Sequence, residues 1–145
     1  MKEVEKAFAY ITNGARLLVF EHVDFPAAGL QVPAGTIRPG EAPEAAALRE
    51  ATEETGLPRF SNVRFLATAR FDARPSGKEE LHVRHFFQLE ASPPVPESWR
   101  HDERQGNDAP GAVITFDLYW LSLIDAAARL AHGHGACIPR LRWHG

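Results

Sequence analysis

Three glutamates between residues 35 and 57 are spaced so that they can bind a cation together. Glu50, Glu53 and Glu54 lie three and four residues apart, so on a helix they fall within one arc of about 100°. Like charges at this spacing cost a helix roughly 0.2–0.5 kcal/mol per pair. Two of them also precede Gly56 in the last turn, where the helix dipole favours positive side chains. Sequences commonly give up local stability at a functional site, and a divalent metal ion is the simplest compensating charge.

The residues around these glutamates predict a loop followed by a helix. Pro39-Gly40 is typical of a turn, and Pro43 suits the first helical position because that position needs no N–H. We expect the helix to end at Thr55, just before Gly56. The face opposite the glutamates should pack on a sheet, and its residues are Ala45, Leu48, Thr52 and Thr55. Two small residues beside the glutamates should leave room for a ligand of that site; these are Ala46 and Ala47.

Alternating side chains in the rest of the chain predict a β-sheet and one more helix. The expected strands cover residues 7–12, 15–20, 63–71, about 81–90 and 113–120. Asn13-Gly14 favours a two-residue hairpin turn between the first two. Ser122 and Asp125 are typical of a helix start, so we expect a second helix over residues 123–132, ended by Gly133.

Two segments lack these patterns. Residues 91–112 contain four prolines and two glycines, so we expect one long surface loop there. Loops of that length often carry function. Residues from His134 onward predict a mobile tail.

Composition narrows the class of protein. A chain of 145 residues is expected to form a single domain, residues 1–145. One cysteine excludes an internal disulfide and indicates a reducing compartment. The N-terminus lacks a signal-peptide pattern and no apolar run is long enough for a membrane span, so we expect a cytoplasmic protein. The net charge of −3 argues against binding of duplex nucleic acid.

The spacing within residues 35–57 resembles the Nudix box. The matching positions are Gly35, Glu41, Arg49, Glu50, Glu53, Glu54, Gly56 and Leu57. The one departure is Ala51, where the pattern prefers a larger aliphatic residue. This resemblance implies a small MutT-like Nudix hydrolase, which cleaves a nucleoside diphosphate linked to another moiety. It also implies an α/β fold, an α/β/α sandwich around a mixed central sheet.

The same resemblance implies a Mg²⁺ site, in which Mn²⁺ can substitute. The residues implied as catalytic are Glu50, Glu53, Glu54 and Arg49. The implied direct ligands are Glu50 and Glu54, with the carbonyl of Ala34 facing the metal. Glu53 is either a third ligand or is held by Arg49, four residues before it. Glu41 either contacts the metal or favours the helix N-terminus. The glutamates alone would also fit a solvated helix face; the full motif favours the metal site.

The implied reaction is attack of water on a phosphorus atom of a diphosphate bridge. The base that takes the proton of the water is either Glu50 or an acidic residue of the 91–112 segment. The candidates in that segment are Glu97, Asp102 and Glu103. Arg70 and Arg84 could pair with phosphates and Trp99 could stack on a nucleobase. Ordinary surface arginines and a packing tryptophan fit these three residues as well.

A nucleoside triphosphate is the leading substrate, because the compact chain resembles the smaller members of the family. ADP-ribose, dinucleoside polyphosphates and coenzyme A stay open as substrates. Two other functions also stay open: a nucleotide-binding module without turnover, and a diphosphate isomerase on the same fold. The isomerase would need a cysteine in the cleft, whereas Cys137 is in the expected tail. A homodimer is compatible with the sequence.

Overall fold

The computed structural model describes residues 1–104 and 112–143. Over these ranges seven strands form one mixed sheet in the order β4-β5-β1-β2-β7-β6, with β3 paired to β1. The strands are β1 (Lys2–Asn13), β2 (Arg16–His22), β3 (Ala34–Thr36), β4 (Phe60–Asp72), β5 (Glu80–Ala91), β6 (Ser98–Arg104) and β7 (Val113–Ser122). The α-helices are α1 (Pro43–Thr55) and α2 (Leu123–Arg129), and the 3₁₀ turns are η1 (Pro26–Ala28), η2 (Arg74–Ser76) and η3 (Ile138–Arg140). Strand β5 runs parallel to β1, and the other pairings are antiparallel.

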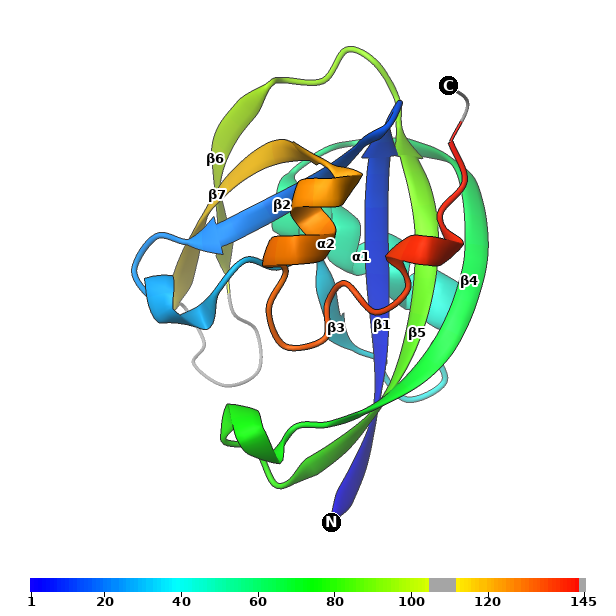
Figure 1. Ribbon diagram of the computed structural model, residues 1–145, viewed down its shortest axis with the longest axis vertical. Coiled ribbons are helices and arrows are strands. Elements are labelled where there is room, and N and C mark those ends of the chain that lie inside the picture. Colours follow the sequence, from blue (N-terminus) through cyan, green and yellow to red (C-terminus); the bar gives the residue numbers. More distant parts are fainter. Residues whose placement is uncertain (105–111, 144–145) are drawn as a thin grey trace.

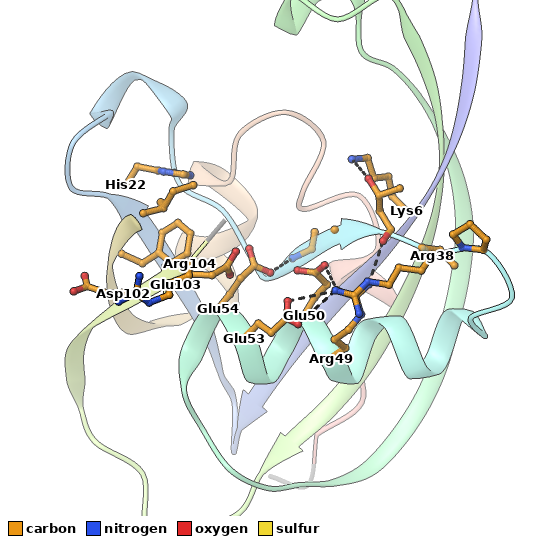
Figure 2. Close-up of a pocket in the computed structure, with 17 residues that line it drawn as sticks. Lys6, His22, Arg38, Arg49, Glu50, Glu53, Glu54, Asp102, Glu103 and Arg104 are labelled. Atoms are coloured by element: carbon orange, nitrogen blue, oxygen red, sulfur yellow. Dashed lines mark hydrogen bonds and ion pairs between the residues drawn. The ribbon is translucent and has the colours of Figure 1, made fainter. Parts of the chain in front are cut away.

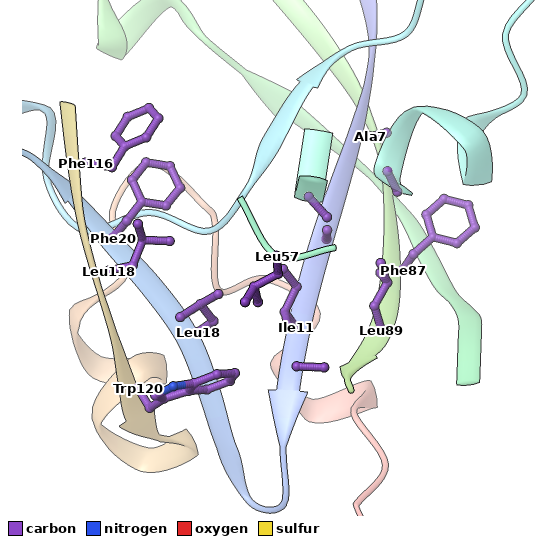
Figure 3. Packing of buried hydrophobic residues seen from close by; sticks show 14 of the residues in the cluster. Ala7, Ile11, Leu18, Phe20, Leu57, Phe87, Leu89, Phe116, Leu118 and Trp120 are labelled. Carbon is purple, nitrogen blue, oxygen red and sulfur yellow. The ribbon is translucent and has the colours of Figure 1, made fainter. Parts of the chain in front are cut away.

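The two helices cover opposite faces of the sheet (Figure 1). Alternate residues of β1 point to the two faces, so Ala7 and Ala9 pack on the α1 side while Phe8 and Tyr10 pack on the α2 side. Figure 3 shows the cluster on the α1 side, where residues of β1, β2, β5 and β7 meet. The predicted α/β/α sandwich with a mixed central sheet is confirmed. None of the helices in the described ranges has the length and apolar character that a membrane crossing needs.

The first hairpin opens a wedge within the sheet. As predicted, its strands meet around Asn13-Gly14, but β1 and β2 pair only at Thr12 with Leu17 and at Asn13 with Arg16. Farther from the turn the two strands diverge, and β3 pairs with residues 6–8 of β1. Around this wedge, Lys6 of β1, His22 of β2 and the residues of β3 line one cavity, described below.

Most predicted element positions are confirmed. Helix α1 has the predicted bounds, and Gly56 follows it with φ of 75°, in the left-handed region. Strands β4, β5 and β7 contain the predicted segments. Ser122 accepts a hydrogen bond from the Asp125 backbone N–H, 3.1 Å, at the start of α2. That helix ends at Arg129 rather than at residue 132.

The predicted packing face of α1 is confirmed for Thr55 and wrong for Ala45 and Thr52. The buried residues of the helix are Ala46, Ala47, Ala51, Glu54 and Thr55, whereas Ala45 and Thr52 are exposed and Leu48 is half-buried against the core. The alanines expected to leave room for a ligand are instead fully buried against the sheet. The physical reason is close approach: small side chains on the helix meet Ala7 and Ala9 on β1, so the helix packs tightly without a large residue.

The predicted mobile tail is also wrong for residues 134–141. His134 is 8% exposed and its Nδ1 accepts a hydrogen bond from the Val32 backbone N–H at 3.1 Å. The Tyr10 hydroxyl donates to the His134 carbonyl at 2.6 Å and accepts from the Cys137 N–H at 3.0 Å. Burial lowers the pKa of His134 to about 3. The segment therefore closes the core on the α2 side.

Candidate active site

Helix α1 and strand β3 bring two of the predicted glutamates together. Glu54 is 7% exposed, and its Oε2 accepts a hydrogen bond from the Ala34 backbone N–H at 2.9 Å. Gly35 lies against Glu50, and a Cβ at Gly35 would overlap the Glu50 carboxylate. A side chain at residue 35 would therefore displace the Glu50 carboxylate from its observed position.

Strand β6 supplies a third carboxylate from within the predicted 91–112 loop. One carboxylate oxygen each from Glu50, Glu54 and Glu103 lies within 4.8 Å of the other two. The strand is fastened to the end of α1 because His101 Nε2 donates to the Glu53 carbonyl and Trp99 Nε1 donates to the Thr55 carbonyl, each at 2.8 Å. These bonds satisfy carbonyls that a helix end leaves free. The expectation of one long loop is thus wrong for residues 98–104; residues 105–111 lie outside the described ranges.

Arg49 holds the glutamates beside this cluster. Its guanidinium donates to both oxygens of Glu41 at 2.8 and 2.9 Å, to Glu50 at 2.7 Å and to the Thr36 carbonyl at 3.2 Å. Glu53 is a weaker partner at 3.5 Å and its side chain is 42% exposed. The hydrogen bonds from Arg49 lower the pKa of Glu41 to about 2. Glu41 is therefore an anchor for Arg49 and lies outside the three-carboxylate cluster.

The three clustered carboxylates have raised pKa values. Burial raises the pKa of Glu50, partly opposed by Arg49. Burial, followed by the charges of Glu50 and Glu103, raises the pKa of Glu54 well above its ordinary value. Burial and the charge of Glu50 raise the pKa of Glu103 to about 7. The protein itself therefore supplies too little positive charge to neutralise three partly desolvated carboxylates that lie this close together.

The cluster lies in a cavity of about 750 Å³. Figure 2 shows the three glutamates between Lys6 and Arg38 on one side and His22 on the other. The remaining lining residues are Ala34, Gly35, Thr36, Ile37, Pro39, Arg49, Glu53, Asp102, Arg104, Ile114 and Phe116. The cavity is large enough for a small-molecule ligand.

Several residues proposed from the sequence lie elsewhere. The three proposed substrate contacts Arg70, Arg84 and Trp99 are not part of the cavity lining, and neither is Glu97. The Arg84 guanidinium lies over the rings of Phe8 and Phe71, at 4.7 and 3.8 Å from their centroids.

The other three make local contacts outside the cavity. Arg70 pairs with Glu3 at 3.4 Å and Glu97 pairs with Arg16 at 2.9 Å. Trp99 packs against the core and binds the end of α1. Asp102 does line the cavity, and its carboxylate accepts a hydrogen bond from the Thr115 hydroxyl at 2.7 Å.

Lys6, His22 and Arg38 are lining residues that the sequence reasoning missed. Arg38 lies inside the Nudix-like segment, three residues before Glu41. Lys6 and His22 come from the diverging ends of β1 and β2, far from the motif in the chain. The available sequence signal for these two residues was an ionisable side chain close to the end of a predicted apolar strand: Lys6 precedes residues 7–12 and His22 follows residues 15–20.

The donor set fits a hard divalent cation. Mg²⁺ takes oxygen ligands, usually one or two carboxylates with waters and substrate phosphates. Glu50, Glu54 and Glu103 offer carboxylate oxygens from two different elements, and their raised pKa values show a deficit of positive charge. Glu103 rather than Glu53 completes this cluster.

A model of the NUDIX domain matches residues 3–141. The chain belongs to the NUDIX family. The family predicted from the sequence is thus confirmed, and its enzyme class, a Nudix pyrophosphohydrolase, is supported. Divalent metal dependence is general to NUDIX enzymes, and this chain carries a matching carboxylate cluster.

Solved structures of NUDIX proteins share this fold. A MutT NUDIX hydrolase from Burkholderia pseudomallei is 18% identical with a TM-score of 0.70, covering 98% of this chain and 100% of that one. The NUDIX domain of Shewanella oneidensis NrtR, solved in complex with ADP ribose, is 18% identical with a TM-score of 0.65, covering 97% and 86%. The Escherichia coli ORF135 protein is 20% identical with a TM-score of 0.61, covering 97% and 89%. No curated protein sequence matches significantly.

Proposed function

We propose that this NUDIX chain catalyses Mg²⁺-dependent hydrolysis of a phosphoanhydride bond in a nucleoside diphosphate-linked substrate. The observation that carries the proposal is the meeting of Glu50, Glu54 and Glu103 within 4.8 Å in the wall of a 750 Å³ cavity. A solvated helix face would not bury Glu54 or recruit a carboxylate from a separate strand.

Glu50 and Glu54 are the proposed metal ligands, with Glu103 and the carbonyl of Ala34 beside them. Bound there, Mg²⁺ would screen phosphate charge and lower the pKa of a coordinated water. Glu103 is the proposed acceptor for the proton of the attacking water. A base is most effective when its pKa is near the working pH, and Glu103 is the one candidate of the three from the 91–112 segment that joins the cluster.

Arg49 is proposed to position Glu50 rather than to touch substrate. Four of its hydrogen bonds hold Glu41, Glu50 and the β3 backbone in one arrangement. Glu53 lies on the cavity wall at the outer side of this network and is proposed to interact through water with ligands in the cavity.

A nucleoside triphosphate is the proposed substrate, as the small MutT-like size suggests. The structural neighbour in complex with ADP ribose supports ADP-ribose as the second candidate. Dinucleoside polyphosphates and coenzyme A are the other candidate substrates. Nucleotide binding without turnover is the alternative to a catalytic function.

The proposal is tested by phosphate and pyrophosphate release from each of these substrates, with Mg²⁺ and then with EDTA. Metal-dependent release from one group is the expected result, and its products identify the bond that is cleaved. Absence of release from all of them, by folded protein with Mg²⁺ bound, would contradict the catalytic proposal.

The raised pKa of Glu103 should make the stability of the metal-free protein depend on pH. An unfolded glutamate titrates near pH 4.3, whereas folded Glu103 titrates at about 7. Because the folded pKa is higher, its contribution is complete below about pH 4.3 and is lost as the pH rises through 7. In EDTA, Glu103→Gln should melt at about the same temperature as the wild type at pH 4 and at a higher temperature at pH 8.

Comparing the wild type with Glu103→Gln separates the effect of Glu103 on stability from the effects of the other titrating groups. His134, whose pKa is lowered, contributes stability that is lost as pH falls instead, and it does so in both proteins. Added Mg²⁺ should raise the wild-type melting temperature more at pH 8 than at pH 6, because metal competes with protons for the carboxylates. A melting difference independent of pH would contradict the raised pKa.

A further inference from the structure

Lys6 is a cation in the cavity wall without a carboxylate partner. Its Nζ donates to the Thr36 hydroxyl at 2.8 Å. Within residues 1–104 and 112–143, no carboxylate lies within ion-pair distance of that ammonium. A lysine ammonium has three N–H groups, so two remain for a ligand.

The position of Lys6 is built into the sheet. Its β1 backbone pairs with Thr36 of β3 on one side and with Arg84 of β5 on the other. Burial, and then the charge of Lys78, lowers the pKa of Lys6. The ammonium is thus partly desolvated at a fixed place, and the carboxylates of Glu80 and Glu50 attract it only from beyond ion-pair distance. An anionic group of the ligand is the natural partner for it.

The cavity has ends of different chemistry. Lys6 and Arg38 lie on one side of the glutamates and His22 lies on the other (Figure 2). The His22 ring packs edge-on against Phe116, with 4.8 Å between centroids. Ile114 lines the cavity as well. Beside the charged residues Asp102 and Arg104, this second end presents the His22 ring and the Ile114 side chain, against which a nucleobase can pack.

We propose that Lys6 binds the terminal phosphate of the substrate and thereby selects nucleotides whose polyphosphate chain ends in a free phosphate. This inference rests on the proposed function and specifies its substrate class. A terminal phosphate carries more negative charge than a phosphate esterified on both sides, and it exposes three oxygens to a point-like ammonium. ADP-ribose instead places a neutral sugar beyond its second phosphate, where the ammonium gains no charge partner.

The decisive variant is Lys6→Gln, with Lys78→Gln as the matched control. Lys78 is near enough to lower the pKa of Lys6 but does not line the cavity, so its loss removes the same charge without the contact. Lys6→Gln should lower kcat/KM for a nucleoside triphosphate about 10- to 100-fold, mainly through KM, the range for one hydrogen bond to a charged group. For ADP-ribose the change should stay within about 2-fold. Lys6→Arg should retain most of the preference for the triphosphate.

Binding of inorganic tripolyphosphate in the presence of Mg²⁺, measured by calorimetry, separates this inference from the catalytic proposal. If the wild type hydrolyses no substrate, the catalytic proposal fails, whereas tripolyphosphate binding that weakens about 10-fold or more in Lys6→Gln and not in Lys78→Gln still supports the role of Lys6. Equal losses for the triphosphate and ADP-ribose would overturn the inference. So would undetectable or unchanged tripolyphosphate binding, or a loss confined to Arg104→Gln at the opposite side of the cavity.

Discussion

Replacing Glu54 by glutamine is expected to lower kcat/KM by more than about 100-fold and to raise the melting temperature of the metal-free protein. Changes one shell outside a metal commonly cost 10- to 100-fold, so loss of a direct carboxylate ligand should cost more. The same change removes a charge that is 7% exposed and is repelled by Glu50 and Glu103. A stabilisation of about 1 kcal/mol corresponds to a rise of about 2–4 °C in a chain of this size. Initial rates at saturating Mg²⁺ and melting in EDTA measure the two effects.

The opposite signs of these effects make the test specific. Glutamine keeps an oxygen that can accept the Ala34 N–H, so the local fold should persist. Glu44→Gln is the control on the same helix, because Glu44 is exposed in the first turn and outside the cavity. Wild-type activity in Glu54→Gln, or a lower melting temperature without metal, would remove Glu54 from the proposed ligand set.

Local signals were sufficient to predict α1 and the neighbourhood of two of its carboxylates. Pro43 and Gly56 mark the ends of the helix, and both ends lie where those residues predict. Helical spacing alone places Glu50 and Glu54 one turn apart, independently of how the helix packs on the sheet. Glycine at residue 35 also belongs to this local arrangement, since a side chain there would displace the Glu50 carboxylate from its observed position.

Strand β6 could not be predicted in the same way because its inward side chains are not a hydrophobic series. Trp99, His101 and Glu103 are half-buried and alternate with exposed residues, which is the period of a strand. Two of the three are polar: His101 binds a helix carbonyl and Glu103 joins the carboxylate cluster. Such alternation is recognisable only once the partners of the polar side chains are known. The third carboxylate of the site was consequently a candidate among three acidic residues.

The proposed substrate contacts Arg70, Arg84 and Trp99 lie outside the cavity lining for a related reason. A sequence shows which residues are cationic, but the face of a strand and the divergence of β1 from β2 decide which of them reach the cavity. Arg84 and Lys6 are register partners on adjacent strands, yet Arg84 lies among Phe8, Phe71 and the chain near His132. Lys6 is the one of the two that lines the cavity.

Replacing Arg49 by methionine is expected to destabilise the protein by about 3 kcal/mol. The Arg49 side chain is 15% exposed, and its loss leaves Glu41 and Glu50 without their cation. Removing one partner of a buried ion pair costs about 3–5 kcal/mol, and the lower value applies because water still reaches this group. With about 2–4 °C per kcal/mol, the melting temperature should fall by about 6–12 °C. Thermal unfolding in EDTA, with the wild type alongside, measures the loss.

Arg49→Lys tests whether geometry or charge is responsible. Lysine keeps the charge but lacks the planar fork that binds Glu41 through two nitrogens while a third donor reaches Glu50. We therefore expect Arg49→Lys to recover less than half of the lost stability and to leave kcat well below that of the wild type, because Glu50 is no longer held at one place. Full recovery by lysine would mean that a positive charge alone suffices beside Glu50. A loss below about 2 °C in Arg49→Met would mean that the glutamates keep their arrangement without this arginine.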